Sequence, residues 1–227
     1  ELLKKNNEYY EIDYFDFENH FRGSEESIFR KQEIYLKYFI GKKNVLDLGC
    51  GRGEFLDTLY ANDITSKGCD TYEPFVDYCR EKGFEVECKD CLEFIKEQKE
   101  VGGIMASQLV EHLNLSQVIE LCKIAFEKLQ DGAFLVMETP NPRCLSVFAN
   151  SFYMDPSHRK PVHPLTLQYL TEKAGFKKVE ILNTPLSREG TIIPELNIEG
   201  AEQFNDSMHQ VQELLFGSQD YAIIAQK

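Results

Sequence analysis

The sequence predicts an α/β, Rossmann-like fold: a seven-stranded, mostly parallel sheet with one antiparallel strand and helices on both faces. Three observations predict it. A short apolar strand, Val45–Leu48, runs into a turn with three alternate glycines and then into a helix. Acidic residues stand where the next two strands end. Strands also alternate with helices along most of the 227 residues, which is typical of a parallel sheet.

The individual elements follow from apolar periodicity and from the residues that end each segment. A helix that begins at Pro74 stops at Gly83, and Ser116 is the expected cap of a later, longer helix. Five strand–helix units followed by a terminal hairpin give the single antiparallel strand. The predicted strands after the first are Thr65–Asp70, Phe84–Cys88, Val101–Ser107, Ala133–Thr139, Val179–Leu182 and Tyr221–Ala225, with helices over Leu165–Ala174 and Phe204–Leu215.

The glycine turn reads D-x-G-x-G-x-G, which differs from the G-x-G-x-x-G of dinucleotide-binding folds and lacks the ending of a P-loop. It resembles motif I of class I S-adenosylmethionine (SAM) methyltransferases. Asp47 suits a ligand with an ammonium group, Asp70 stands where ribose hydroxyls are bound, and the resemblance implies that Asp90 binds the adenine amino group. SAM is therefore the expected cofactor. The expected cofactor-binding residues in these segments are Asp47, Gly49, Gly51, Gly53, Asp70, Thr71, Asp90, Cys91, Leu92, Ser107 and Gln108.

Composition disfavours several classes of protein. The net charge of −13 disfavours binding to nucleic acid or to anionic membranes. No apolar run approaches the roughly 18 residues of a membrane-spanning helix, and seven scattered cysteines indicate reduced thiols in a cytoplasmic protein. The chain begins with Glu, which indicates a piece of a longer polypeptide. We expect a single domain, with an N-terminal lid or helical segment over residues 1–40 and the SAM-binding core over 41–227.

Three segments are expected to meet beyond the carboxyl ends of the strands. The first is the aromatic run 14–24 with the helix that follows it, which methyltransferases of this class often fold over SAM as a lid. Arg22 or Arg30 could pair there with the methionine carboxylate of the cofactor. The alternative is a surface segment with a few buried aromatic side chains.

The second segment is Glu111-His112, directly after the fourth strand. A hydroxyl acceptor needs a base for its proton, and His112 is titratable near neutral pH. Glu111 could orient His112, or the two could hold a metal. The alternative is that His112 only caps a turn beneath the cofactor.

The third segment is the loop 150–164, where this fold places substrate contacts. In so acidic a chain its basic side chains suit a phosphate or another anionic acceptor, which is already ionised and needs positioning rather than a base. The alternative is a loop with ordinary solvated charges. The candidate substrate-binding residues are Tyr153, His158, Arg159 and Arg143, with Lys160 and His163 nearby.

These segments together resemble a particular family. The patterns Y-x-x-F-E-x-x-x-R-G-S, D-L-G-C-G-R-G-E, V-E-H, E-T-P-N-P and S-F-Y-x-D-P-[ST]-H-x-[KR]-P are similar to the methyltransferase domain of O-antigen chain-terminating enzymes. These cytoplasmic proteins cap a lipid-linked polysaccharide by methylating a terminal phosphate or sugar hydroxyl. The resemblance extends to about Leu182 and places Tyr14, Arg22 and His158 at matching positions. Phe15 departs from the basic residue expected there.

A more distant resemblance is to small-RNA 2′-O-methyltransferases, whose E-x-x-E-H, T-P-N and downstream His bind a divalent metal. Gln108 replaces the first acid here, and an amide is a poorer ligand for a hard cation. We therefore predict no metal. The leading prediction is an enzyme: a SAM-dependent O-methyltransferase with Glu111, His112 and His158 as catalytic residues and a terminal sugar hydroxyl or sugar phosphate as acceptor. The alternatives are a catalytically idle docking module of a glycan-assembly protein and a metal-assisted 2′-O-methyltransferase.

Overall fold

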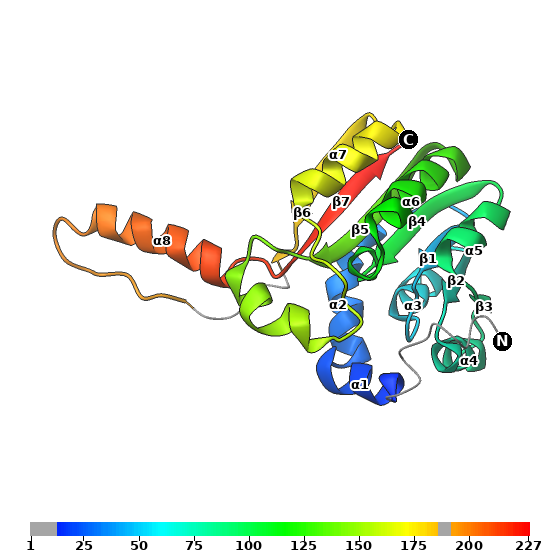
Figure 1. Cartoon of the computed structure of the whole chain (residues 1–227), viewed down its shortest axis with the longest axis horizontal. Coiled ribbons are helices and arrows are strands. Elements are labelled where there is room, and N and C mark those ends of the chain that lie inside the picture. Colours follow the sequence, from blue (N-terminus) through cyan, green and yellow to red (C-terminus); the bar gives the residue numbers. More distant parts are fainter. Residues whose placement is uncertain (1–12, 186–191) are drawn as a thin grey trace.

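The computed structural model describes residues 13–185 and 192–227. Its seven strands are β1 Val45–Leu48, β2 Ser66–Asp70, β3 Val86–Cys88, β4 Val101–Ser107, β5 Leu129–Pro140, β6 Lys178–Asn183 and β7 Asp220–Gln226. They form one sheet in the order β3-β2-β1-β4-β5-β7-β6 (Figure 1). The neighbours from β3 to β5 are parallel, and β7 is antiparallel to both β5 and β6. The predicted fold class is confirmed.

Helices cover both faces of the sheet because alternate strand residues point to opposite sides. Leu46, Ile104 and Leu135 pack beneath α5, α6 and α7, while Val45 and Met105 pack against the side chains of α2 and α3. The helices are α1 Tyr14–Phe21, α2 Glu25–Leu36, α3 Glu54–Tyr60, α4 Glu73–Glu81, α5 Cys91–Glu97, α6 Leu115–Lys128, α7 Pro164–Ala174 and α8 Glu202–Phe216, with short helical turns at Val110–His112, Val147–Ser151 and Phe152–Met154.

Local signals explain where the helices that frame the site begin. The side chain of Asn114 accepts from the backbone N–H of Gln117, and the Gln117 side chain caps Asn114 in return. The cap of α6 is therefore Asn114 and the predicted cap at Ser116 is wrong, because Asn114 completes this reciprocal pair two residues earlier. Gly53 starts α3 with a positive φ of 81°, and Asp90 caps α5.

Helix α1 lies across the carboxyl ends of the strands, and α2 runs from there along one face of the sheet (Figure 1). Tyr14 of α1 packs against Tyr72 and Phe75 at the end of β2. Tyr35 and Phe39 are fully buried in the core with α3. The segment before β1 is thus anchored in the core at one end and covers the strand ends at the other.

One element stands apart from the sheet. Figure 1 shows α8 extending away from the body of the molecule, and none of its residues is buried. The irregular segment 192–200 returns alongside it, where Leu196 and Asn205 exchange hydrogen bonds between backbone and side chain. No helix in the described part of the chain is long and apolar enough to cross a membrane.

Candidate functional site

A cavity of about 570 Å³ lies at the carboxyl ends of β1, β2, β4 and β5 and beneath α1 and α2. The glycine turn forms its floor, and residues 151–159 close one end. Its lining includes the predicted residues Tyr14, Arg22, Gly49, Gly51, Asp70, Thr71, Asp90, Cys91, Ser107, Gln108, His112, His158 and Arg159.

Asp70 joins the end of β2 to the glycine turn. Its Oδ2 accepts from the backbone N–H of Gly51 at 3.0 Å, and its Oδ1 accepts from that of Tyr72 at 2.9 Å. Gly51 has a positive φ of 52°, and a Cβ there would lie 3.0 Å from Arg22 Nη1. A side chain at Gly51 would therefore crowd the Arg22 guanidinium, and glycine allows the turn and the lid to approach each other closely.

Three predicted cofactor-binding residues support the cavity without lining it: Asp47, Gly53 and Leu92. Asp47 is buried under the glycine turn, where burial and the neighbouring Glu54 carboxylate raise its pKa to about 8. Gly53 faces Cys79 on α4. The backbone N–H of Leu92 donates to Asp90 Oδ1 at 2.8 Å, so Leu92 shapes the cap of α5. The structure thus places these three next to the cavity, and their direct contacts with the cofactor stay a prediction.

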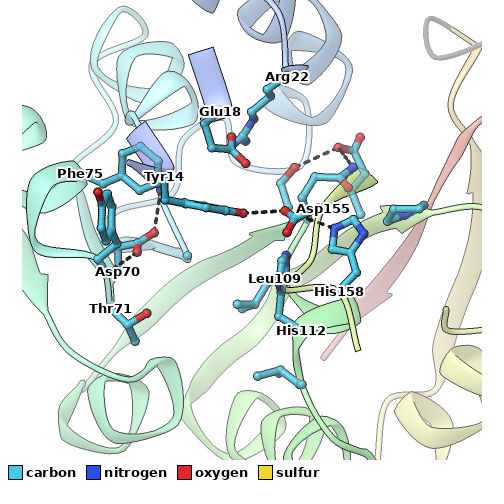
Figure 2. Close-up of a pocket in the computed structure, with 18 of the residues that line it drawn as sticks. Tyr14, Glu18, Arg22, Asp70, Thr71, Phe75, Leu109, His112, Asp155 and His158 are labelled. Atoms are coloured by element: carbon cyan, nitrogen blue, oxygen red, sulfur yellow. Dashed lines mark hydrogen bonds and ion pairs between the residues drawn. The ribbon is translucent and has the colours of Figure 1, made fainter. Parts of the chain in front are cut away.

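The lid presents two of its three predicted residues to the cavity. Arg22 lines the cavity and forms an ion pair with Glu18 at 3.0 Å. The hydroxyl of Tyr14 donates to Asp155 Oδ2 at 2.6 Å and so joins α1 to the loop opposite (Figure 2). Arg30 does not reach the cavity, because it lies on the exposed side of α2 and pairs there with Glu26.

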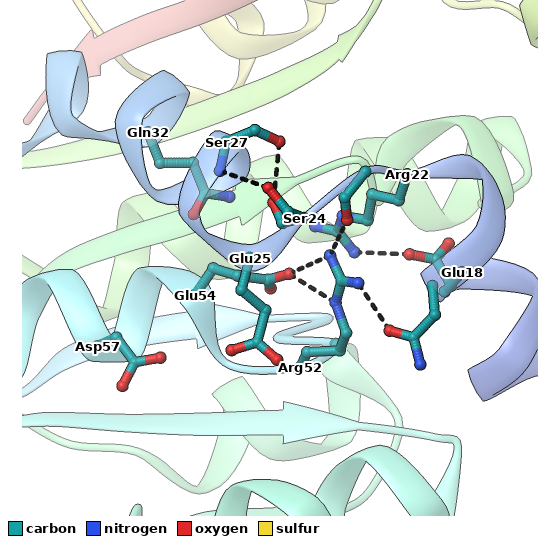
Figure 3. A network of polar contacts seen from close by, with 12 residues as sticks. Glu18, Arg22, Ser24, Glu25, Ser27, Gln32, Arg52, Glu54 and Asp57 are labelled. Carbon is teal, nitrogen blue, oxygen red and sulfur yellow. Dashed lines mark hydrogen bonds and ion pairs between the residues drawn. The ribbon is translucent and has the colours of Figure 1, made fainter.

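The lid is also fastened to the glycine turn from below (Figure 3). Arg52, 2% exposed, forms an ion pair with Glu54 at 2.6 Å. Its guanidinium also donates to Asn19 Oδ1 at 2.8 Å and to the backbone oxygen of Gly23 at 3.1 Å. A buried cation in the turn thereby holds the junction between α1 and α2.

At the opposite end of the cavity, His112 and His158 lie with their ring centroids 4.8 Å apart (Figure 2). Ser157 donates its hydroxyl proton to Asp155 Oδ1 at 2.5 Å, so its oxygen accepts from His112 Nδ1 at 3.0 Å. His158 Nδ1 donates to the backbone oxygen of Phe152 at 2.6 Å. Both rings are thereby held in the tautomer whose Nε2 carries a free lone pair.

Glu111 lies behind the two histidines and is fully buried. Thr139 donates to its Oε2 at 2.9 Å, while Oε1 has no hydrogen-bond partner within residues 13–185 and 192–227. Burial raises the pKa of Glu111 to about 8. Burial and the neighbouring His158 lower the pKa of His112 to about 4, so His112 is neutral at pH 7.

The predicted cationic acceptor site is only partly assembled. Arg159 and His158 line the cavity, but Arg143, Tyr153 and Lys160 do not. Tyr153 points outward and is 66% exposed, because Phe152 takes the buried position beside it. The structure thus places Arg143 and Tyr153 outside the cavity lining, and their contacts with a substrate stay a prediction.

Sequence reasoning missed four lining or supporting residues: Gln32, Glu138, Asp155 and Ser157. Asp155 and Ser157 lie within the D-P-S-H pattern, which was the available signal. Gln32 is a polar residue inside the buried stripe of α2, and Glu138 is an acid inside an apolar strand. A polar residue at a core position is a general signal for a site, although it does not specify the ligand.

Comparisons with known proteins agree with this geometry. The model of the methyltransferase domain family matches residues 21–181. A SAM-dependent methyltransferase from Archaeoglobus fulgidus is 39% identical, with a TM-score of 0.85, and the match covers 94% of this chain and 99% of that one. No curated protein matches the chain significantly.

Two more distant structures share the fold. A SAM-dependent methyltransferase from Mesorhizobium loti is 14% identical with a TM-score of 0.59, over 87% of this chain and 98% of that one. A mycolic acid cyclopropane synthase complexed with S-adenosylhomocysteine (SAH) is 14% identical with a TM-score of 0.58, over 88% and 84% of the two chains. The glycine turn, whose Gly49 and Gly51 line the cavity beside Asp70, fits this cofactor. The chain therefore belongs to the methyltransferase domain family, and it is a class I SAM-dependent methyltransferase.

Proposed function

We propose that this chain is a cytoplasmic O-methyltransferase that transfers the methyl group of SAM to a terminal sugar hydroxyl of a polysaccharide or other glycoconjugate. The support is the stretch Ser151–His158, the most specific part of the resemblance to O-antigen capping enzymes. This stretch supplies Asp155 and His158 to the cavity wall and Ser157 behind it. With a net charge of −13, no nucleic acid partner is expected.

The observation that carries the choice of a hydroxyl is the His112 ring, neutral and with a free Nε2 at the cavity wall. SAM would supply a methyl group on its sulfonium; the acceptor oxygen would attack this methyl in line, and SAH would leave as the neutral thioether with the electron pair of the S–CH3 bond. His112 Nε2 takes the proton of that hydroxyl, and the Ser157–Asp155 pair holds the ring in place while it does so.

The charges that line the cavity are less favourable for a phosphate acceptor. Six carboxylates line it, against four Lys or Arg side chains. Two of those four cations are already paired, Arg22 with Glu18 and Lys89 with Glu87 and Glu97. A dianion would therefore meet more repulsion than attraction, whereas a neutral hydroxyl would not.

We expect His112→Ala to lower the rate of methyl transfer to a hydroxyl acceptor about a hundredfold, the usual effect of a general base. Because burial lowers the pKa of His112 to about 4, its base form persists on acidification. The wild-type rate should stay flat from pH 8 to about 5.5 and fall only as the pH approaches 4. The measurement is initial rate with labelled SAM on a panel of sugars and sugar phosphates.

SAH binding is the control in this experiment and should change less than about twofold in His112→Ala. If the enzyme methylates sugar phosphates alone, and His112→Ala leaves that rate intact, the hydroxyl proposal is wrong. If the rate already falls to half near pH 6.5, the base has the pKa of an ordinary histidine, and the lowered pKa expected for His112 is wrong.

A second candidate function, metal-assisted methyl transfer, is favoured by one observation. Glu111, His112 and His158 each offer a ligand atom, and these atoms all lie within 4.8 Å of one another. The unpartnered Glu111 Oε1 and the two free Nε2 atoms fit a divalent cation. Such an ion supplies Lewis-acid activation of the acceptor oxygen. Gln108 does not take part, because its amide donates to Glu138 and Asp220.

Metal removal separates the two functions. If His112 is the base, enzyme treated with a chelator keeps its full activity. If the cation is required, the chelated enzyme loses at least about 90% of its activity and regains it with Mn²⁺ or Mg²⁺. Glu111→Gln should then abolish the rescue, and metal content measured by mass spectrometry provides the independent readout.

A further inference from the structure

A chain of polar side chains forms the wall of the cavity where α2 meets the ends of β4 and β5. Gln32 of α2 is 4% exposed, and its Nε2 donates to Ser107 Oγ at 3.3 Å. Ser107 in turn donates its hydroxyl proton to Glu138 Oε1 at 2.9 Å. Since that hydroxyl has one proton, it can only accept from Gln32. The Gln32 amide is therefore oriented with its nitrogen toward Ser107, and its oxygen, Oε1, takes no part in this chain of hydrogen bonds.

Gln32 Oε1 has no hydrogen-bond partner within the described part of the chain. A buried carbonyl oxygen without a donor costs about 1–3 kcal/mol, so proteins rarely leave one unsatisfied. Because Gln32 lines the cofactor cavity, the donor can come from a bound ligand. The ligand group beside Gln32 is therefore expected to carry an N–H or O–H.

Glu138 indicates that the ligand group at this wall is positively charged. It is 8% exposed and accepts hydrogen bonds from three neutral side chains, Tyr35, Ser107 and Gln108. No Lys, Arg or His side chain forms an ion pair with it among the residues that the structure describes. A buried carboxylate with no countercharge is costly, and a cationic ligand group at this wall would supply one.

SAM carries two cationic groups, and only one of them is a donor. Its sulfonium has no N–H or O–H, whereas its α-ammonium has three N–H groups. Asp47, the acid expected from the sequence to meet this ammonium, lies outside the cavity lining. Arg22, the candidate for the carboxylate of the same amino acid, also lines the cavity, and Figure 3 shows it in one view with Gln32.

We propose that Gln32 Oε1 accepts a hydrogen bond from the α-ammonium of SAM, with Glu138 as the buried countercharge. Gln32 is thus a cofactor-positioning residue that distinguishes the amino acid end of SAM from any adenosine thioether without an amine. The inference concerns the cofactor and stands whether the acceptor is a hydroxyl or a phosphate.

The test is a calorimetric titration of wild type and Gln32→Met with two ligands: SAH and its analogue without the α-amino group. Methionine keeps the length of glutamine and removes the carbonyl oxygen. We expect Gln32→Met to weaken SAH binding at least about tenfold, which is the usual loss for a hydrogen bond to a charged group. The deaminated analogue should bind both proteins equally within about twofold. Glu33→Gln, an exposed change on the same helix, is the control and should leave both ligands unaffected.

Three other results overturn the proposal. An equal loss for both ligands would show that Gln32 acts through packing alone, and no loss for either would show that its oxygen does not face the ammonium. A raised acceptor KM with unchanged SAH binding would also overturn it, by assigning this wall to the acceptor. If Gln32→Met does not fold, Ser107→Ala frees the Gln32 amide to rotate, and it should weaken SAH more than the deaminated analogue.

Discussion

Asp70→Ala is expected to lower the affinity for SAM at least about a hundredfold, the largest binding loss that we predict. The Asp70 carboxylate lies at the end of β2 in the cavity wall, where the ribose hydroxyls of the cofactor are expected. Two hydrogen bonds from hydroxyls to a carboxylate contribute about 1.5–3 kcal/mol each. The same carboxylate accepts from the backbone N–H groups of Gly51 and Tyr72, so its removal also loosens the glycine turn.

Asp70→Asn separates these two contributions. The amide keeps one acceptor oxygen, so we expect an affinity between those of the wild type and Asp70→Ala. Calorimetry with SAM and SAH measures the affinities of both variants. The melting temperature without ligand measures how much stability the glycine turn has lost. Unchanged binding in Asp70→Ala would mean that the ribose lies elsewhere.

Arg52→Met is expected to lower the free energy of unfolding by about 3–5 kcal/mol, because it leaves the Glu54 carboxylate buried without its partner. For a chain of this size that loss lowers Tm by roughly 6–15 °C. Burial by itself raises the pKa of Glu54, yet the nearby Arg22 and Arg52 bring it below its ordinary value, which shows how strongly the two cations act on it. SAM binding should weaken as well, since Asn19 and Gly23 lose the guanidinium that holds the lid (Figure 3).

The matched control is the double variant that carries Arg52→Met and Glu54→Gln. Removing both charges together is expected to recover at least half of the lost stability while the weakened SAM binding remains. Urea unfolding followed by circular dichroism measures the free energy of unfolding, and calorimetry measures the affinity for SAM. A loss of stability below about 1 kcal/mol in Arg52→Met would show that the pair is no stronger than an exposed one.

The sheet could be predicted closely because its signals are local. Apolar runs, glycines and strand-end acids are read directly from neighbouring residues, and β4 begins and ends at the predicted residues, Val101 and Ser107. The cap of α6 was misplaced because Asn114 and Ser116 are both good capping residues, and the reciprocal bond with Gln117 decided between them.

The site was less predictable because its geometry depends on contacts between distant segments. A sequence pattern marks Asp47 as polar near a glycine turn, but only the packing of α3 and the lid places it beneath the cavity. Arg22 and Arg30 look equivalent in the sequence, and the turn at Gly23 directs them to different environments. Gln32 meets Ser107 across 75 positions, a pairing for which the sequence offers no signal.

The hydrogen bond between Tyr14 and Asp155 joins segments 141 positions apart, the helix α1 and the loop that closes one end of the cavity. Any displacement of α1 away from the cavity would break this bond. The loop that contains Ser157 then loses the tie that steadies Asp155. A single hydrogen bond therefore connects the position of α1 with the geometry of the loop that carries Ser157 and His158, so a change at one end of the cavity affects the other.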